Sequence, residues 1–100
     1  MTKIYHEEKG DEILISAQGH TDSRVCNAVS VLLDTLAIRL HEVSKNTHRE
    51  AHSGYLYLRA KGRFVRPAYD TIMCGIRQLA EQYPKDIELI EGCPIFDKEN

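Results

Sequence analysis

The chain has 100 residues, of which 42% are hydrophobic and 28% are charged, and its formal net charge is −2. This length and composition are typical of one globular domain and argue against a disordered chain. The small net charge disfavours a protein whose main partner is nucleic acid or a membrane surface. No apolar stretch is long enough to cross a bilayer.

The three cysteines, Cys26, Cys74 and Cys93, form no Cys-x-x-Cys pair, which argues against a zinc knuckle and a thioredoxin-type motif. The first residues lack the apolar core of a signal peptide, so export is not indicated. We therefore expect free thiols in a reducing, cytoplasmic setting and no cofactor.

The first half of the chain predicts two strands followed by a long helix. Residues 3–18 alternate between apolar and polar side chains on both sides of a turn at residues 9–11. Apolar side chains then recur every three or four residues from Val25 to Val43, with Asp22 or Ser23 as the helix N-cap. Val31 and Ile38 lie beside this apolar stripe, which predicts a helix buried on more than one side.

The second half predicts a connector, a strand, a helix and a final strand. Residues 44–54 are polar and aperiodic, and residues 55–61 alternate, with a bend at Gly62 before a continuation to Val65. Pro67 suits the first position of a helix that Pro84 terminates, and residues 86–92 form the last strand. The order β-β-α-β-α-β predicts an α+β fold of one domain over residues 1–100, a mixed sheet with two helices on one face.

The stretch "GHTDSRVCNAVS", residues 19–30, places His20 at the end of a strand and Cys26 in the first turn of the long helix. A helix N-terminus favours the thiolate of a cysteine, and a nearby imidazole can give a proton to a leaving amine. Backbone N–H groups of Cys26 or Asn27 are candidate oxyanion donors. This chemistry suits acyl transfer, but Cys26 equally suits a small core residue and His20 an exposed strand end.

The segments "SAQGH" and "VCNAVSVL" resemble the signature of the ribosomal-processing cysteine protease (Prp) family, and the resemblance extends to about Leu89. It implies Cys26 as nucleophile, His20 as its catalytic partner, and supporting positions that include Gly19 and Ser30. Residues 91–100 are a tail outside the resemblance. Only "TDSRV" separates His20 from Cys26, which is shorter than in most relatives. Ser23 stands where an aspartate is usual, and Asp22 precedes it.

The resemblance also implies a substrate and an assembly. Family members remove an N-terminal extension from a large-subunit ribosomal protein, phage-borne relatives process capsid or scaffold proteins, and the family is generally dimeric. We therefore expect a cytoplasmic cysteine endopeptidase that forms a homodimer and has a protein substrate. The alternative, motivated by the short loop and by Ser23, is a non-catalytic binding or assembly protein of the same fold.

Two other features suggest different functions. His48 and His52 are four residues apart, as metal ligands on a helix would be, but Arg49 stands where the zincin motif has glutamate, so a solvated loop is favoured and no metal is expected. Basic residues cluster near the third strand and offer a surface for RNA or an acidic protein segment; the simpler interpretation is a solvated strand end. These residues are Arg59, Lys61, Arg63 and Arg66.

Overall fold

The computed structural model describes residues 1–92, which form five strands and two helices. Cys93 and the rest of the predicted tail lie outside the described residues. The helices and strands follow one another as β1 (Thr2–Lys9), β2 (Glu12–Gln18), α1 (Ser23–Val43), β3 (Asn46–His52), β4 (Tyr55–Lys61), α2 (Val65–Gln82) and β5 (Ile87–Glu91).

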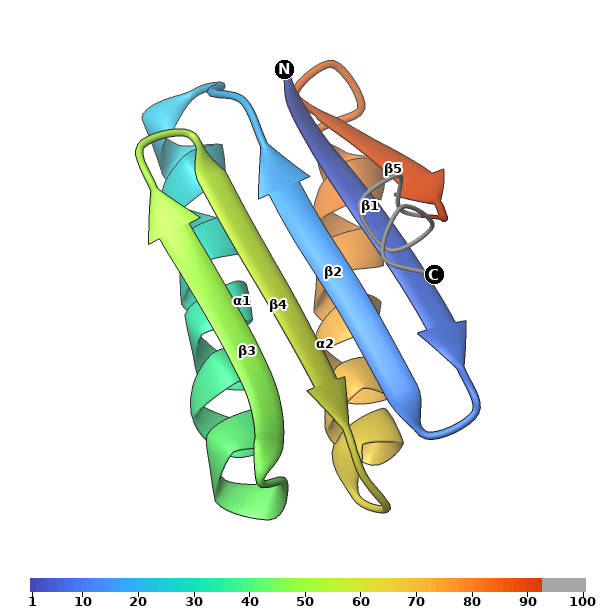
Figure 1. The fold of residues 1–100 in the computed structure, drawn as a ribbon. Coiled ribbons are helices and arrows are strands. Elements are labelled where there is room, and N and C mark those ends of the chain that lie inside the picture. Colours follow the sequence, from blue (N-terminus) through green and yellow to red (C-terminus); the bar gives the residue numbers. More distant parts are fainter. Residues whose placement is uncertain (93–100) are drawn as a thin grey trace.

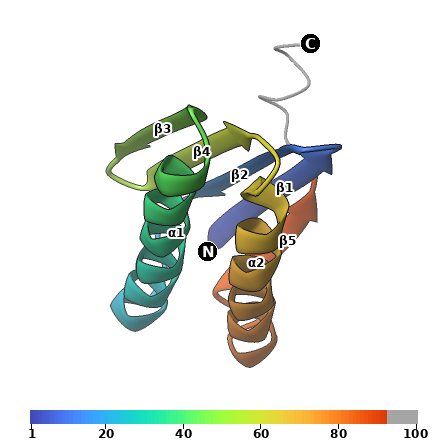
Figure 2. The same ribbon diagram turned by 90° about the horizontal axis from the view of Figure 1, so that it is seen from below.

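The five strands form one mixed sheet in the order β3-β4-β2-β1-β5 (Figure 1). β1 pairs with β5 in parallel, and the other three pairings are antiparallel. Both helices cover the same face of this sheet, with α1 below the β3–β4 half and α2 below the β1–β5 half (Figure 2). The predicted α+β class and the two-helix layer are confirmed.

The predicted order lacked one strand, because the polar segment at residues 44–54 is not a connector. Residues Asn46–His52 form β3, which pairs with β4 from Asn46↔Lys61 to His52↔Tyr55. The strand was missed because most of its residues are exposed and no apolar side chain marks an alternating pattern. The dipeptide Ser53-Gly54 was the available signal, since this pair is typical of a tight hairpin turn.

The second helix begins earlier than predicted. β4 ends at Lys61, and α2 begins at Val65, so residues 63–65 do not continue the strand. Pro67 is the third residue of α2 rather than the first. Proline is tolerated there because N–H groups in the first helical turn have no partner within the helix.

α1 contributes one apolar face to the core rather than being buried on several sides. Its fully buried side chains recur every three to four residues and pack against the inward side chains of the sheet and of α2. They are Val25, Val29, Leu33, Leu36 and Leu40. The expectation for Val31 and Ile38 was wrong, because these side chains are 64% and 65% exposed.

Leu33→Ala should lower the free energy of unfolding by about 2–5 kcal/mol, because it leaves a cavity at a fully buried position. Val31→Ala, two residues away on the exposed side, should change it by less than about 0.5 kcal/mol. Urea unfolding followed by circular dichroism measures both. Similar losses in the two variants would contradict the assignment of the inner and outer faces of α1.

Candidate active site

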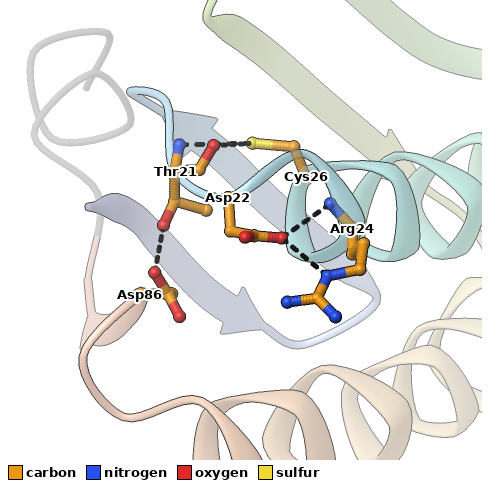
Figure 3. Close-up of polar contacts among 5 residues, drawn as sticks. All are labelled: Thr21, Asp22, Arg24, Cys26 and Asp86. Atoms are coloured by element: carbon orange, nitrogen blue, oxygen red, sulfur yellow. Dashed lines mark hydrogen bonds and ion pairs between the residues drawn. The ribbon is translucent and has the colours of Figure 1, made fainter.

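The His20–Cys26 segment is the junction between β2 and α1, and Asp22 is the N-cap that starts the helix. The Asp22 carboxylate accepts hydrogen bonds from the Arg24 backbone N–H at 2.9 Å and from Arg24 Nε at 3.2 Å (Figure 3). Both bonds lower the pKa of Asp22 below its usual value, and the bond from the Arg24 side chain has the larger effect. The N-cap predicted at Asp22 or Ser23 is therefore Asp22.

Gly19 allows the chain to turn sharply where β2 ends. Its φ of +100° lies in the region that favours glycine, and a Cβ built at this position would lie 2.5 Å from the Met1 carbonyl oxygen. The Met1 amino group donates a hydrogen bond to the His20 carbonyl at 2.9 Å. The start of β1 thus fixes the backbone that carries His20.

Cys26 is half-buried, and its sulfur faces the backbone of Thr21. The Thr21 N–H donates to Cys26 Sγ at 3.3 Å, and the thiol lies 3.5 Å from the Thr21 carbonyl oxygen (Figure 3). The Cys26 N–H already donates to the Asp22 carbonyl at 2.9 Å, so this expected oxyanion donor is occupied by the helix. The Thr21 N–H is instead the backbone donor directed at the sulfur.

Thr21 is fixed in turn by a residue from the opposite end of the chain. Its hydroxyl donates a 2.5 Å hydrogen bond to the carboxylate of Asp86, which precedes β5 (Figure 3). The Asp86 carbonyl also accepts a 2.8 Å bond from the Thr2 N–H. The loop before α1 is therefore attached to the edge of the sheet where β1 and β5 lie.

His20 is exposed and its ring rests on the tip of the β3–β4 hairpin. A Cβ built at Gly54 would lie 2.7 Å from His20 Nε2, and Gly54 has a φ of +72°. The Gly54 carbonyl accepts a 2.8 Å bond from the Gly19 N–H, so the tip is also attached to the chain just before His20. Sequence reasoning missed Gly54, because it lies 34 residues from His20.

One cavity of about 270 Å³ brings the two proposed catalytic residues together. His20 and Cys26 both line it, together with Gly19 and Ser30 from the same motif. Its remaining walls come from β3, β4 and the turn between them, from α1, from the end of β2 and from the start of β1. No hydrogen bond among residues 1–92 joins His20 to Cys26, whose sulfur contacts the Thr21 backbone.

The other proposed supporting residues lie outside this cavity. Asn27 lines a shallow hollow between α1 and α2 with Val31 and Leu79. Asp22 and Ser23 are at the exposed start of the helix and are absent from the cavity wall. Asp22 therefore supports the site through helix capping, whereas the structure gives Asn27 and Ser23 no contact with it.

A second histidine, His52, lines the same cavity and was not predicted there. Its ring stacks on Tyr55 with ring centres 4.7 Å apart and an angle of 14° between the planes. Both residues flank the hairpin turn, and both line the cavity. His52 lines the same cavity as Cys26 because β3 pairs with β4. Sequence analysis missed His52 here because it did not predict β3.

His48 and His52 lie on β3. The basic stretch runs from Arg59 in β4 to Arg66 in α2. On a strand, a four-residue spacing does not bring the side chains of His48 and His52 together as it does on a helix. Within residues 1–92, no cluster of three or more metal-ligating side chains occurs. In the basic stretch, Arg59 pairs with Glu12 at 2.9 Å and Arg66 with Glu8 at 3.2 Å.

Neither α1 nor α2 has the apolar length that a membrane-spanning helix requires.

Thr21→Val should slow iodoacetamide labelling of Cys26 at pH 6.5 by about 2- to 10-fold, because the loop that directs the N–H at the sulfur loses its bond to Asp86. Thr21→Ser keeps the hydroxyl and should label at the wild-type rate. Peptide mass spectrometry separates Cys26 from Cys74, which serves as the control in the same molecule. Equal Cys26 rates in the Val and Ser variants would refute a positioning role for this bond.

Gly54→Ala should displace the His20 ring, because the new methyl group would lie 2.7 Å from Nε2. Gly10→Ala is the matched control, since Gly10 also has a positive φ but a Cβ there meets no atom within 4 Å. Both variants carry similar backbone strain. The NMR signals of the His20 ring should move only in the Gly54 variant, and equal shifts in both would contradict the contact.

A family model described as cysteine protease Prp matches residues 1–88. The ribosomal processing protease Prp from S. aureus, in complex with a covalently linked product peptide, is similar in structure with a TM-score of 0.80. The two chains are 14% identical over 92% of this chain and 100% of that chain. SMU.848 from Streptococcus mutans has a TM-score of 0.70 and is 17% identical over 91% of this chain and 93% of that one.

The likeness to these structures confirms the fold, and no curated protein matches the chain. The family model, in contrast, spans β1 to β4, both helices and the whole His20–Cys26 junction, and ends within β5. The chain therefore belongs to the cysteine protease Prp family.

Proposed function

We propose that this protein is a cysteine endopeptidase with Cys26 as nucleophile and His20 as its acid–base partner. The observation that carries this proposal is the shared cavity, which both Cys26 and His20 line. The Thr21 N–H and the Thr21 carbonyl both contact Cys26 Sγ and fix the sulfur at the start of α1.

The reaction follows from these positions. His20 accepts the thiol proton, and Sγ attacks the scissile carbonyl carbon to form a C–S bond. His20 then gives this proton to the leaving amine as the C–N bond breaks. Water cleaves the thioester, releases the acid and restores the thiol through His20. The Cys26 N–H, an expected oxyanion donor, is bonded to the Asp22 carbonyl, and the Thr21 N–H is directed at Sγ, so neither is assigned to the oxyanion here.

The substrate we propose is the N-terminal extension of a large-subunit ribosomal protein, with a phage capsid or scaffold protein as the second candidate. Membership of the Prp family supports a protein substrate, and the S. aureus relative is described as a ribosomal processing protease with a bound product peptide. We further propose that the protein is a cytoplasmic homodimer that acts on protein rather than nucleic acid.

A non-catalytic binding protein is the second candidate function. Two observations favour it: the sulfur is engaged by Thr21, and no hydrogen bond within residues 1–92 links His20 to Cys26. In this alternative the same cavity would hold a peptide without cutting it. Binding without turnover in the wild-type protein is the result that separates the two functions.

Cys26→Ala should abolish cleavage, and His20→Ala should reduce it by about 10²- to 10⁴-fold, because the general acid is lost. Cys74→Ala is the matched control, since Cys74 is an exposed thiol on α2 and should leave the rate unchanged. The substrates are bacterial large-subunit ribosomal proteins with their N-terminal extensions and a proteome-derived peptide library, read by mass spectrometry. Cleavage that persists in Cys26→Ala with an intact circular dichroism spectrum would refute the mechanism.

A further inference from the structure

The inward face of β3 lacks the large apolar side chains that fill the rest of the sheet. Thr47, Arg49 and Ala51 alternate along this face, opposite Ala60, Leu58 and Leu56 of β4. These β4 residues belong to the core or pack against it, whereas the three β3 residues are polar or small. The space between β3 and α1 is therefore only partly filled.

Two hollows lie in this space, and they meet at one ion pair. The first is the cavity of about 270 Å³ that holds Cys26 and His20, and the second, of about 590 Å³, lies farther along α1. Both are lined by Asp34 and Arg49, whose side chains are 3.2 Å apart. The Asp34–Arg49 pair thus stands where the two hollows adjoin, and the two hollows together are called the trough between α1 and β3.

The second hollow is mainly apolar. Its walls include four aliphatic side chains, Ala37, Ile38, Leu40 and Leu58. Ile38 is 65% exposed and lies outside the buried apolar stripe of α1. An apolar side chain from another molecule would remove this surface from water.

β3 also provides a backbone edge along the trough. It is the terminal strand of the sheet, and no strand within residues 1–92 pairs with its outer side. Figure 2 shows α1 lying below this edge. Such an edge accepts an extended peptide through main-chain hydrogen bonds, while alternate side chains enter pockets on one face.

We propose that the substrate binds as an additional strand along β3 and that the second hollow is a distal specificity pocket for a large apolar side chain. This inference rests on the proposed protease function, because the trough includes the Cys26 cavity. Thr47 and Ala51 are four residues apart in β3, or about 13 Å at ~3.3 Å per residue. Two substrate side chains four residues apart would therefore enter the two hollows.

The side chain between them would face the Asp34–Arg49 pair. A large apolar group would desolvate this ion pair without replacing its water contacts, so a small or polar residue is favoured at this position. The complete pattern is an extended segment with an apolar residue near the scissile bond, a small or polar residue two positions away, and a second apolar residue four positions away.

Thr47→Phe tests the distal pocket by filling it from β3, where an aromatic residue suits a strand. Ile38→Gln, at an exposed position, makes the same pocket polar with little risk to the fold. Glu50→Phe is the matched control, because it puts the same ring on the opposite face of β3 and outside both hollows. The probe is a peptide library prepared from a bacterial proteome, with cleavage sites read by mass spectrometry.

The wild-type protein and Glu50→Phe should prefer apolar residues at two positions four residues apart. Thr47→Phe and Ile38→Gln should lose the distal preference alone, with kcat/KM lowered at least about 10-fold for peptides that carry a large apolar residue there. Peptides with glycine at that position should be cut at the wild-type rate. Identical profiles for all four proteins would overturn the pocket while leaving the protease function intact.

If the wild-type protein cuts no substrate, the proposed protease function fails, and binding then decides the further inference. Hydrogen exchange of Cys26→Ala with the same library should protect the backbone amides of β3, and Thr47→Phe in this background should remove the protection. Absence of protection would overturn the proposal. Protection of the β3 amides without peptide, increasing with protein concentration, would also overturn the proposal. It would show that a second copy of the chain covers the edge of β3.

Discussion

The arrangement of the site depends on how the short segment before α1 is held. Thr21 directs its N–H to the Cys26 sulfur at 3.3 Å, and its hydroxyl binds Asp86, 65 residues away. The neighbouring backbone is fixed as well, by the Met1 amino group at the His20 carbonyl and by the Gly19–Gly54 bond. Apart from the Thr21–Cys26 contact, these bonds join distant parts of the chain. A loop of five residues between His20 and Cys26 is therefore held in one position without a longer lid.

The β3–β4 hairpin completes the site from the other side. Its tip supports the His20 ring, because Gly54 leaves room where any side chain would collide with Nε2. Its first strand turns Thr47, Arg49 and Ala51 toward α1, and these residues leave space that Leu or Ile would fill. A single polar strand thus both limits the hydrophobic core and creates the trough that leads to Cys26. The cost in buried apolar area is local, because the remaining inward side chains pack in one continuous cluster.

The sequence predicted those parts of the molecule that local pattern determines. The apolar period of α1, the Asp22 cap and the alternation of β2 and β4 follow from neighbouring residues. β3 could not be predicted in the same way, because its inward residues are polar or small and its stability comes from pairing with β4. Val31 and Ile38 were misplaced since hydrophobicity alone does not show which side of a helix is covered. Gly54, Asp86 and His52 reach the site through contacts that only the folded chain creates.

The separation of His20 from Cys26 bears on which proton transfer the geometry favours. The imidazole and the sulfur line one cavity without a hydrogen bond to each other, and the sulfur has its own donor in Thr21. In the mechanism proposed above, a scissile peptide in this cavity presents its carbonyl carbon to Sγ and its nitrogen to His20. This order matches the step in which the amine leaves, where the acid must reach the nitrogen rather than the sulfur. In the proposed mechanism one residue, His20, therefore takes the thiol proton first and delivers it to this nitrogen second.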